Sequence, residues 1–149
     1  MAVQRDRPYA QFNFLVDLGT GDPGSPDAGF QECSPIAAEV AVVEYRNGND
    51  KENSVHKLTG LNRVSNVVLK RGLIGTLTLF DWFNEVRNGG DGTRTVRIQL
   101  LNEDHTEPVM TWILLRARIV KWAAGPLNAK GNDIALEELT LAYERLELE

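Results

Sequence analysis

The sequence has few of the residues from which metal and redox sites are built. Cys33 is the only cysteine in 149 residues, so an intrachain disulfide and a thiolate zinc site are both excluded. We interpret Cys33 as a small, partly buried apolar residue. The two histidines, His56 and His105, stand in polar segments without metal-ligand spacing, and we interpret both as surface residues. The sequence therefore predicts no metal ion and no cofactor.

Motifs for catalysis and for anion binding are missing as well. No histidine–serine or cysteine–histidine grouping and no nucleophile elbow accompanies the carboxylates, so we predict no catalytic residues and no enzyme. The glycine-rich stretch from Gly19 to Gly29 lacks the ending of a phosphate loop, and we interpret it as a flexible connection. A net charge of −5 argues against a protein that binds nucleic acid by neutralising phosphates.

Long hydrophobic runs are absent. No run approaches the ~18 apolar residues that a membrane span needs, and the N-terminal MAVQRDRPYAQ lacks the apolar segment of a signal peptide. We therefore expect synthesis in a cytoplasm and no direct membrane insertion by this subunit. With 42% hydrophobic and 25% charged residues the composition is that of a globular domain, and we expect residues 1–149 to form one domain.

A helix is predicted at about residues 77–88. Its apolar residues recur at i, i+3, i+4 and i+7 and so share one face: Leu79, Trp82, Phe83 and Val86. Thr78 is the predicted N-cap, and Asn88 and Gly89 supply residues that tolerate the left-handed conformation at the end of a helix. Because roughly three helical turns are marginal alone in water, this face must pack against the rest of the chain.

Most other segments have the residue pattern of strands. The predicted strands are Tyr9–Leu18, Phe30–Tyr45, Arg63–Lys70, Thr93–Asn102 and Val109–Trp122. Within Thr93–Asn102, alternation places Val96 and Ile98 inside and Arg97 and Gln99 outside. The strand Val109–Trp122 is apolar on both faces through Leu115. A second layer or a neighbouring subunit must therefore cover each side of it.

The C-terminal segment, Asp133–Glu149, allows two interpretations. Its alanine, leucine and glutamate residues favour a helix, whereas its alternation favours a strand with bulges near Glu137-Glu138 and Glu144-Arg145. The residues alone leave both open.

The segment Arg46–Thr59 is too polar to pack a core of its own. Only Val55 and Leu58 are aliphatic among its residues, and Asn47-Gly48 is a turn signal. It is either a simple surface loop or an arm that becomes ordered against another chain.

Four motifs together resemble one protein family over nearly the whole chain. They are EYRNGN at Glu44–Asn49, KLTGLNRVSNVVLKRGL at Lys57–Leu73, LFDWFNEVRNG at Leu79–Gly89, and LNAKGNDIALEELTLAYERLEL at Leu127–Leu148. In this order they resemble the tail tube proteins of contractile phages of the T-even type and of phage-derived extracellular contractile injection systems. The glycine–proline stretch 19–29 is longer than in the shorter members.

The resemblance implies a mainly β fold: an antiparallel two-sheet β-sandwich or open barrel with one flanking helix, and a strand at the C-terminus. It implies hexameric rings that stack into a hollow tube inside a contractile sheath. The implied partners are the chain itself, the sheath protein, the baseplate or spike and tube-terminating proteins, and luminal cargo, either protein effector or DNA. The particle would be a virion or an injection system made in a bacterial cytoplasm.

The resemblance also assigns roles to individual residues. A polar hairpin arm at about residues 44–60 would contact neighbouring subunits and rings through Glu44, Tyr45, Arg46, Asn47, Lys51, Val55 and Lys57. Arg97 and Gln99 are candidates for the channel lining, which an acidic subunit predicts to be neutral to acidic. Two other functions stay open: a tube-initiating or baseplate adaptor ring of similar fold, and a small-ligand-binding β-barrel with a closed apolar pocket.

Overall fold

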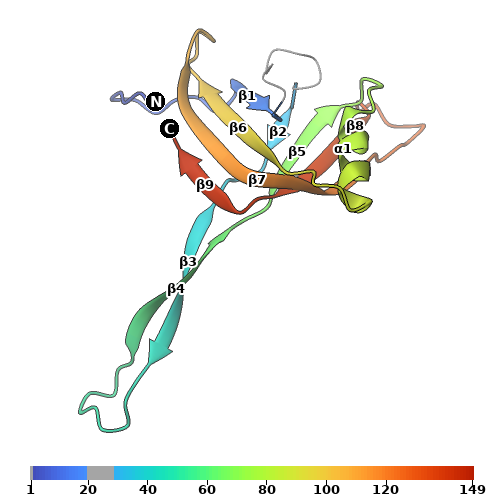
Figure 1. Ribbon diagram of the computed structural model, residues 1–149. Coiled ribbons are helices and arrows are strands. Elements are labelled where there is room, and N and C mark those ends of the chain that lie inside the picture. Colours follow the sequence, from blue (N-terminus) through green and yellow to red (C-terminus); the bar gives the residue numbers. More distant parts are fainter. Residues whose placement is uncertain (1, 20–28) are drawn as a thin grey trace.

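The computed structural model describes residues 2–19 and 29–149, and these form nine strands and one helix (Figure 1). The strands are β1 (Phe14–Asp17), β2 (Glu32–Cys33), β3 (Ala38–Tyr45), β4 (His56–Val64), β5 (Val67–Gly72), β6 (Arg94–Leu101), β7 (Pro108–Ala124), β8 (Leu136–Ala142) and β9 (Arg145–Leu148), and the helix is α1 (Thr78–Arg87). This confirms the predicted mainly β fold with one helix. The predicted connection 19–29 lies almost entirely outside the described residues.

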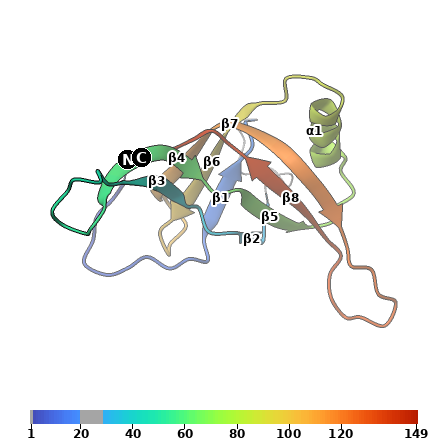
Figure 2. The same cartoon turned by 90° about the horizontal axis from the view of Figure 1, so that it is seen from below.

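The strands form one large sheet and one hairpin. The seven-stranded sheet has the order β1-β6-β7-β8-β5-β2, with β9 also paired to β7, and all its pairs are antiparallel. The other sheet contains only β3 and β4, which extend away from the body as a hairpin (Figure 1). The hairpin and α1 lie at opposite ends of the molecule in both views (Figures 1 and 2).

Strand β7 joins the two halves of the large sheet. Its first part pairs with β6 on one side and β9 on the other, and from Arg118 onward it pairs with β8. Arg116 lies between these parts with a positive φ of 52°, where β7 has one residue more than β6. Such a bulge bends a strand and increases its twist. The sheet therefore curves into an open barrel, and its terminal strands β1 and β2 are not paired with each other.

The core lies between the two halves of this curved sheet. Its buried side chains come from both halves and include Val16, Val67, Leu69, Val96, Leu114, Ile119, Leu139 and Leu141. Helix α1 covers one end of the core: Leu79 and Trp82 are buried, and Phe83 and Val86 pack against the same cluster.

The ends of α1 differ in how well the sequence predicts them. Asn88 is the C-cap and Gly89 has a φ of +88°, as predicted. The predicted N-cap is wrong, because Leu77 occupies that position without a side-chain cap. The Thr78 hydroxyl instead lies 3.3 Å from the Thr76 hydroxyl, so it is engaged outside the helix.

Two predicted strands are interrupted where the hairpin joins the body. The segment predicted as Phe30–Tyr45 contains β2 and β3, which belong to different sheets, with Pro35 in the link between them. Arg63–Lys70 likewise breaks after Val64. The Ser65 N–H donates to the Ala37 carbonyl at 3.0 Å, and this hydrogen bond ties the two links together.

The C-terminal segment forms strands, which excludes the helical interpretation. Strand β8 ends at Ala142 and β9 begins at Arg145, close to the predicted irregularity at Glu144-Arg145. The predicted bulge at Glu137-Glu138 is wrong, because β8 pairs with β5 in an unbroken register there. Glu137 simply points into the core, where it is 3% exposed and forms an ion pair with Arg71.

Candidate functional site

The β3–β4 hairpin, residues Ala38–Val64, is the most exposed apolar element that the structure describes, and we call it the arm. Its large exposed hydrophobic residues are Val40, Val42, Val43, Tyr45, Val55, Leu58 and Leu61. An isolated two-stranded hairpin is marginally stable at best in water. Exposed apolar residues concentrated on such an element indicate a surface that another molecule covers.

The two faces of the arm differ in polarity over its outer half, residues 42–45 and 56–59. Val43 pairs with Leu58, and Tyr45 pairs with His56, so these four residues share one face. The opposite face carries the pair of Val42 with Thr59 and the charged pair of Glu44 with Lys57. We call the face of Val43, Tyr45 and Leu58 the apolar arm face. The same face also carries Glu39, paired with Arg63 at the base of the arm.

The tip of the arm is held by its own polar contacts. The Arg46 guanidinium donates to the Glu52 and Asp50 carbonyls, each at 3.0 Å. The Asp50 carboxylate accepts from the Asn47 N–H at 3.0 Å and lies 3.4 Å from His56 Nε2. The tip therefore has local polar contacts of its own.

The structure places the predicted arm residues along the tip and the adjoining strand ends. Glu44 and Tyr45 end β3, Lys57 lies near the start of β4, and Arg46, Asn47, Lys51 and Val55 lie in the connection. All are exposed except Arg46, which is half-buried. The hairpin is longer than the predicted span 44–60, because β3 and β4 carry it from Ala38 to Val64.

Arg97 and Gln99 lie on the face of β6 that points away from the core. Arg97 is exposed and pairs with Asp17 of β1 and Ile113 of β7, and Ile113 pairs in turn with Glu147 of β9. Arg145 lies on the same face, and its guanidinium donates to Glu147 at 2.5 Å. Basic and acidic groups therefore alternate across this face.

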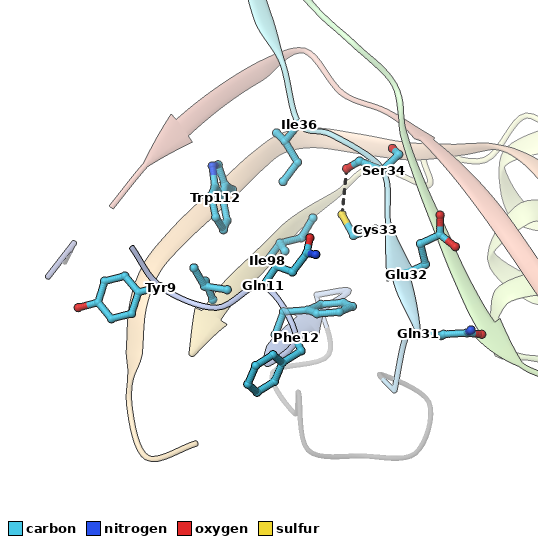
Figure 3. Close-up of a pocket in the computed structure, with 12 residues that line it drawn as sticks. Tyr9, Gln11, Phe12, Gln31, Glu32, Cys33, Ser34, Ile36, Ile98 and Trp112 are labelled. Atoms are coloured by element: carbon cyan, nitrogen blue, oxygen red, sulfur yellow. Dashed lines mark hydrogen bonds between the residues drawn. The ribbon is translucent and has the colours of Figure 1, made fainter. Parts of the chain in front are cut away.

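A groove opens where the curved sheet fails to close, and we call it the seam groove (Figure 3). Its volume is about 590 Å³. The groove is lined from three sides. One side comes from the segment before β1 and from β1 itself: Tyr9, Gln11, Phe12 and Phe14. The other side comes from β2 and its flanking residues, Gln31, Glu32, Cys33, Ser34 and Ile36, and the floor comes from β6 and β7, with Ile98, Leu100 and Trp112. Phe12 is 69% exposed at the rim. The groove therefore presents apolar side chains that a closed barrel would bury.

Cys33 lies in this groove and is partly shielded from water. Desolvation raises the pKa of the thiol to about 11. The Cys33 Sγ lies 3.3 Å from the carbonyl oxygen of Ser34, to which it donates (Figure 3). At neutral pH the group is a protonated, weakly reactive thiol, which agrees with its interpretation as a small apolar residue.

The N-terminal segment is clamped to the β6–β7 turn. The Arg5 guanidinium donates to both carboxylate oxygens of Glu103, at 2.5 and 2.8 Å, and lies 3.7 Å from the centre of the Tyr9 ring. This hydrogen bonding lowers the pKa of Glu103 to about 2 and raises the pKa of Arg5. The Val3 N–H also donates to the Val109 carbonyl at 2.8 Å, so the segment follows the start of β7.

Sequence patterns did not predict the seam groove or the buried Arg71–Glu137 ion pair. The groove is assembled from segments that are far apart in the chain, so no local pattern marks it. The ion pair did leave a signal, since the doublet Lys70-Arg71 is opposed by Glu137-Glu138 in adjacent antiparallel strands.

Neither a metal cluster nor a membrane-crossing helix is found in the described part of the chain. Within residues 2–19 and 29–149, no group of three or more histidine, cysteine, aspartate or glutamate side chains is placed to hold a metal ion. In the same residues, no helix has the length and apolarity that crossing a membrane requires.

Comparison with known families gives one match over most of the chain. A family model described as "T4-like virus tail tube protein gp19" matches residues 10–147. This agrees with the resemblance drawn from the sequence. No curated protein matches the chain.

Solved structures of similar chains come from contractile injection systems. A chain of the PVC sheath–tube complex in the extended state, an extracellular contractile injection system, is 27% identical with a TM-score of 0.81, and the match covers 95% of this chain and 91% of that one. A chain of the PVC sheath/tube terminator structure is 27% identical with a TM-score of 0.83 and coverages of 97% and 98%. A chain of the six-fold symmetrised baseplate of the anti-feeding prophage is 27% identical with a TM-score of 0.80, and 97% of each chain is covered.

Proposed function

Because the chain belongs to the family of the T4-like virus tail tube protein gp19, we propose that it is the subunit that builds the inner tube of a contractile injection system. Members of this family are structural tail tube proteins and not enzymes. In this proposal, rings of six copies stack into a hollow tube inside a sheath, and cargo passes through the channel. The partners are further copies of the chain, the sheath protein, and baseplate and tube-terminating proteins.

The similar structures favour an injection system over a phage tail. The three chains described above come from the PVC and anti-feeding prophage particles, and each aligns over more than nine-tenths of this chain. They belong to a sheath–tube complex, a sheath/tube terminator and a six-fold symmetrised baseplate. These are the assemblies in which a tube subunit with the proposed partners is expected. The particle itself would be assembled in a bacterial cytoplasm.

The single observation that carries the proposal is the exposed arm. Apolar residues are exposed on both of its faces, and neither edge of the hairpin is paired with another described strand. A monomeric protein would keep such a surface in water, with the risk of uncontrolled association. In a tube, neighbouring copies cover it. We therefore assign the predicted residues 44–60 to contacts between subunits and between rings.

The channel lining is proposed from the charge pattern. Arg97 and Gln99 would face the channel, with Asp17, Arg145 and Glu147 as cross-strand neighbours on the same face. Because acidic and basic groups alternate there, the lining would be close to neutral and would not retain anionic cargo.

Assembly of an arm variant tests the proposal. Leu58 is 53% exposed, so Leu58→Asp should leave the subunit folded while placing a charge where a neighbour must bind. Light scattering over a concentration series should show large assemblies for the native chain and only small species for Leu58→Asp. Leu127→Asp is the control, because Leu127 is 83% exposed on the β7–β8 connection, away from the arm. A native chain that stays monomeric at every concentration would refute the proposal.

A second candidate is a terminating or adaptor ring of the same fold. It is favoured by the similarity to a chain in the sheath/tube terminator structure. The two candidates differ in extent of growth, since a tube subunit polymerises without limit and an adaptor stops at one ring.

A further inference from the structure

We propose that the seam groove binds the apolar arm face of a second copy of this chain, so that Val43, Tyr45 and Leu58 of one copy cover Leu100 and Trp112 of the next. The inference rests on the proposed tube function, which supplies the second copy. It identifies the seam groove as the surface that binds the arm, and it identifies which face of the arm is bound.

The groove has the surface and size expected of such a receptor. Leu100 and Trp112 lie on the core-facing side of β6 and β7, and they are only half-buried because the sheet is open between β1 and β2. Ile98 lies on the same side but is 3% exposed. Phe12 adds an exposed aromatic ring at the rim. The volume of about 590 Å³ lies within the roughly 300–1,000 Å³ of pockets that bury a bound molecule. It therefore has room for more than one side chain of the arm.

The strand edges on the two sides are also complementary. Among the described strands, β1 is paired only with β6 and β2 only with β5, so each has an edge facing the groove without a strand beside it. Strands β3 and β4 are paired only with each other. An extended segment that enters between β1 and β2 can therefore add main-chain hydrogen bonds to the apolar contacts, as in recognition by strand addition.

The arm of the same copy cannot fill its own groove. Ile36 lines the groove, β3 begins two residues later, and the arm then runs away from the body (Figure 1). At about 3.3 Å per residue, Tyr45 lies about 30 Å along the strand from Ile36. The occupant must therefore come from another molecule. Since every copy carries one arm and one groove, the contact repeats head to tail and can build a ring or a stack.

The polarity of the arm decides which face enters. In the outer half of the arm, the apolar arm face offers Val43, Tyr45 and Leu58, whereas the opposite face would bring Glu44 and Lys57 against the groove floor. The charged pair on the apolar arm face, Glu39 with Arg63, lies at the base of the arm. Removing Glu44 and Lys57 from water is unfavourable even when they are paired with each other. The structure therefore assigns the Val43 face, and not the Val42 face, to the groove.

The only cysteine of the chain makes this contact directly testable. Cys33 lies in the groove, so a second thiol on the arm can be linked to it by a short bismaleimide. The matched variants are Val43→Cys and Val42→Cys, which are adjacent, similarly exposed at 53% and 59%, and on opposite arm faces. In assembled tubes, Val43→Cys should give a ladder of covalent oligomers on a denaturing gel, and Val42→Cys should remain largely monomeric. Equal ladders for both variants, or none for Val43→Cys, would overturn the proposal.

A measurement on the native chain keeps the proposal falsifiable if a variant fails to assemble. Maleimide labelling of Cys33, at alkaline pH because its thiol pKa is raised, should be several-fold faster in dissociated subunits than in tubes. Equal labelling rates in both states would overturn the docking. Electron microscopy distinguishes failure of the docking from failure of the proposed function. Tubes in which Cys33 is not protected refute only the docking. A native chain that never forms tubes refutes the proposed function and the docking with it.

Discussion

Arg71 and Glu137 face each other across β5 and β8 in the centre of the subunit, with Nε and Oε1 2.6 Å apart and exposed fractions of 1% and 3%. The remaining polar atoms are also engaged. Arg71 donates to the Thr76 hydroxyl at 3.0 Å, and Glu137 accepts from the Trp122 indole at 3.2 Å. The ion pair therefore connects the sheet, the start of α1 and the end of β7 in one network.

The first prediction concerns this pair. Arg71→Met should cost about 3–5 kcal/mol of unfolding free energy, because it leaves the Glu137 carboxylate buried without its counter-charge. The control is Lys70→Met, one residue earlier, whose ammonium lies 4.0 Å from Glu138 at the surface. An exposed pair contributes roughly 0–1 kcal/mol. Urea unfolding of dissociated subunits measures both, and equal losses would contradict a structural role for the buried pair.

The second prediction concerns the contact between α1 and the segment after it. The Trp82 indole donates to the Gly92 carbonyl at 2.6 Å, and a Cβ at Gly92 would lie 2.3 Å from Cγ2 of Val86. Gly92→Ala should therefore cost about 1–3 kcal/mol through overpacking. Gly48→Ala on the arm tip is the matched control, since no atom lies within 4 Å of the place its methyl group would take. If Gly92→Ala left the thermal unfolding temperature unchanged, the Val86 side chain would have to move aside at no cost, which would contradict this prediction.

The third prediction follows from the pKa of Glu103, which its hydrogen bond with Arg5 lowers from 4.5 to about 2. Because the folded pKa is the lower one, the stabilisation is complete above about pH 4.5 and is lost as the pH falls through 2. Arg5→Leu should move the Glu103 titration up towards 4.5 in carboxyl NMR of dissociated subunits. Arg7→Leu, with the same change of charge in the same segment, should leave it near 2. An unchanged titration in Arg5→Leu would refute the clamp.

The fourth prediction concerns the order of the arm. Fixing a backbone costs about 1–2 kcal/mol per residue, and the exposed arm has few packing contacts to offset this in the free subunit. Hydrogen exchange of residues 46–59 should therefore be fast before assembly and slow in tubes. The body strand β8 serves as the internal control, because its inward-facing residues are buried in the subunit. Equal protection of the arm in both states would mean that its order comes from the subunit alone.

Local periodicity was sufficient to predict some elements and not others. The positions of Leu79 and Trp82 fix one face of a helix, and Val96 and Ile98 fix one face of a strand, because each pattern depends only on neighbours in the chain. Glu137 could not be placed this way. A charged residue on the core-facing side looks like a slip in phase, and its partner Arg71 is 66 residues away. Sequence patterns show such a pair only when the register of the two strands is known.

The interaction surfaces were also only partly predictable. The polarity of residues 46–59 identified a segment that cannot pack a core of its own, and the family resemblance supplied its role. The seam groove depends instead on the absence of pairing between β1 and β2 and on the bend of β7 at Arg116. Both are properties of the whole sheet. Local patterns around Phe12, Cys33 and Trp112 therefore predict only core or surface positions, and not a shared groove.

The most direct test of the tube function is electron microscopy of the purified native chain at high concentration. We expect rings seen end-on with six-fold symmetry and a central hole, and long straight tubes seen from the side, with each arm in contact with a neighbouring copy. Particles that remain single subunits, or aggregates without a central channel, would contradict the tube function.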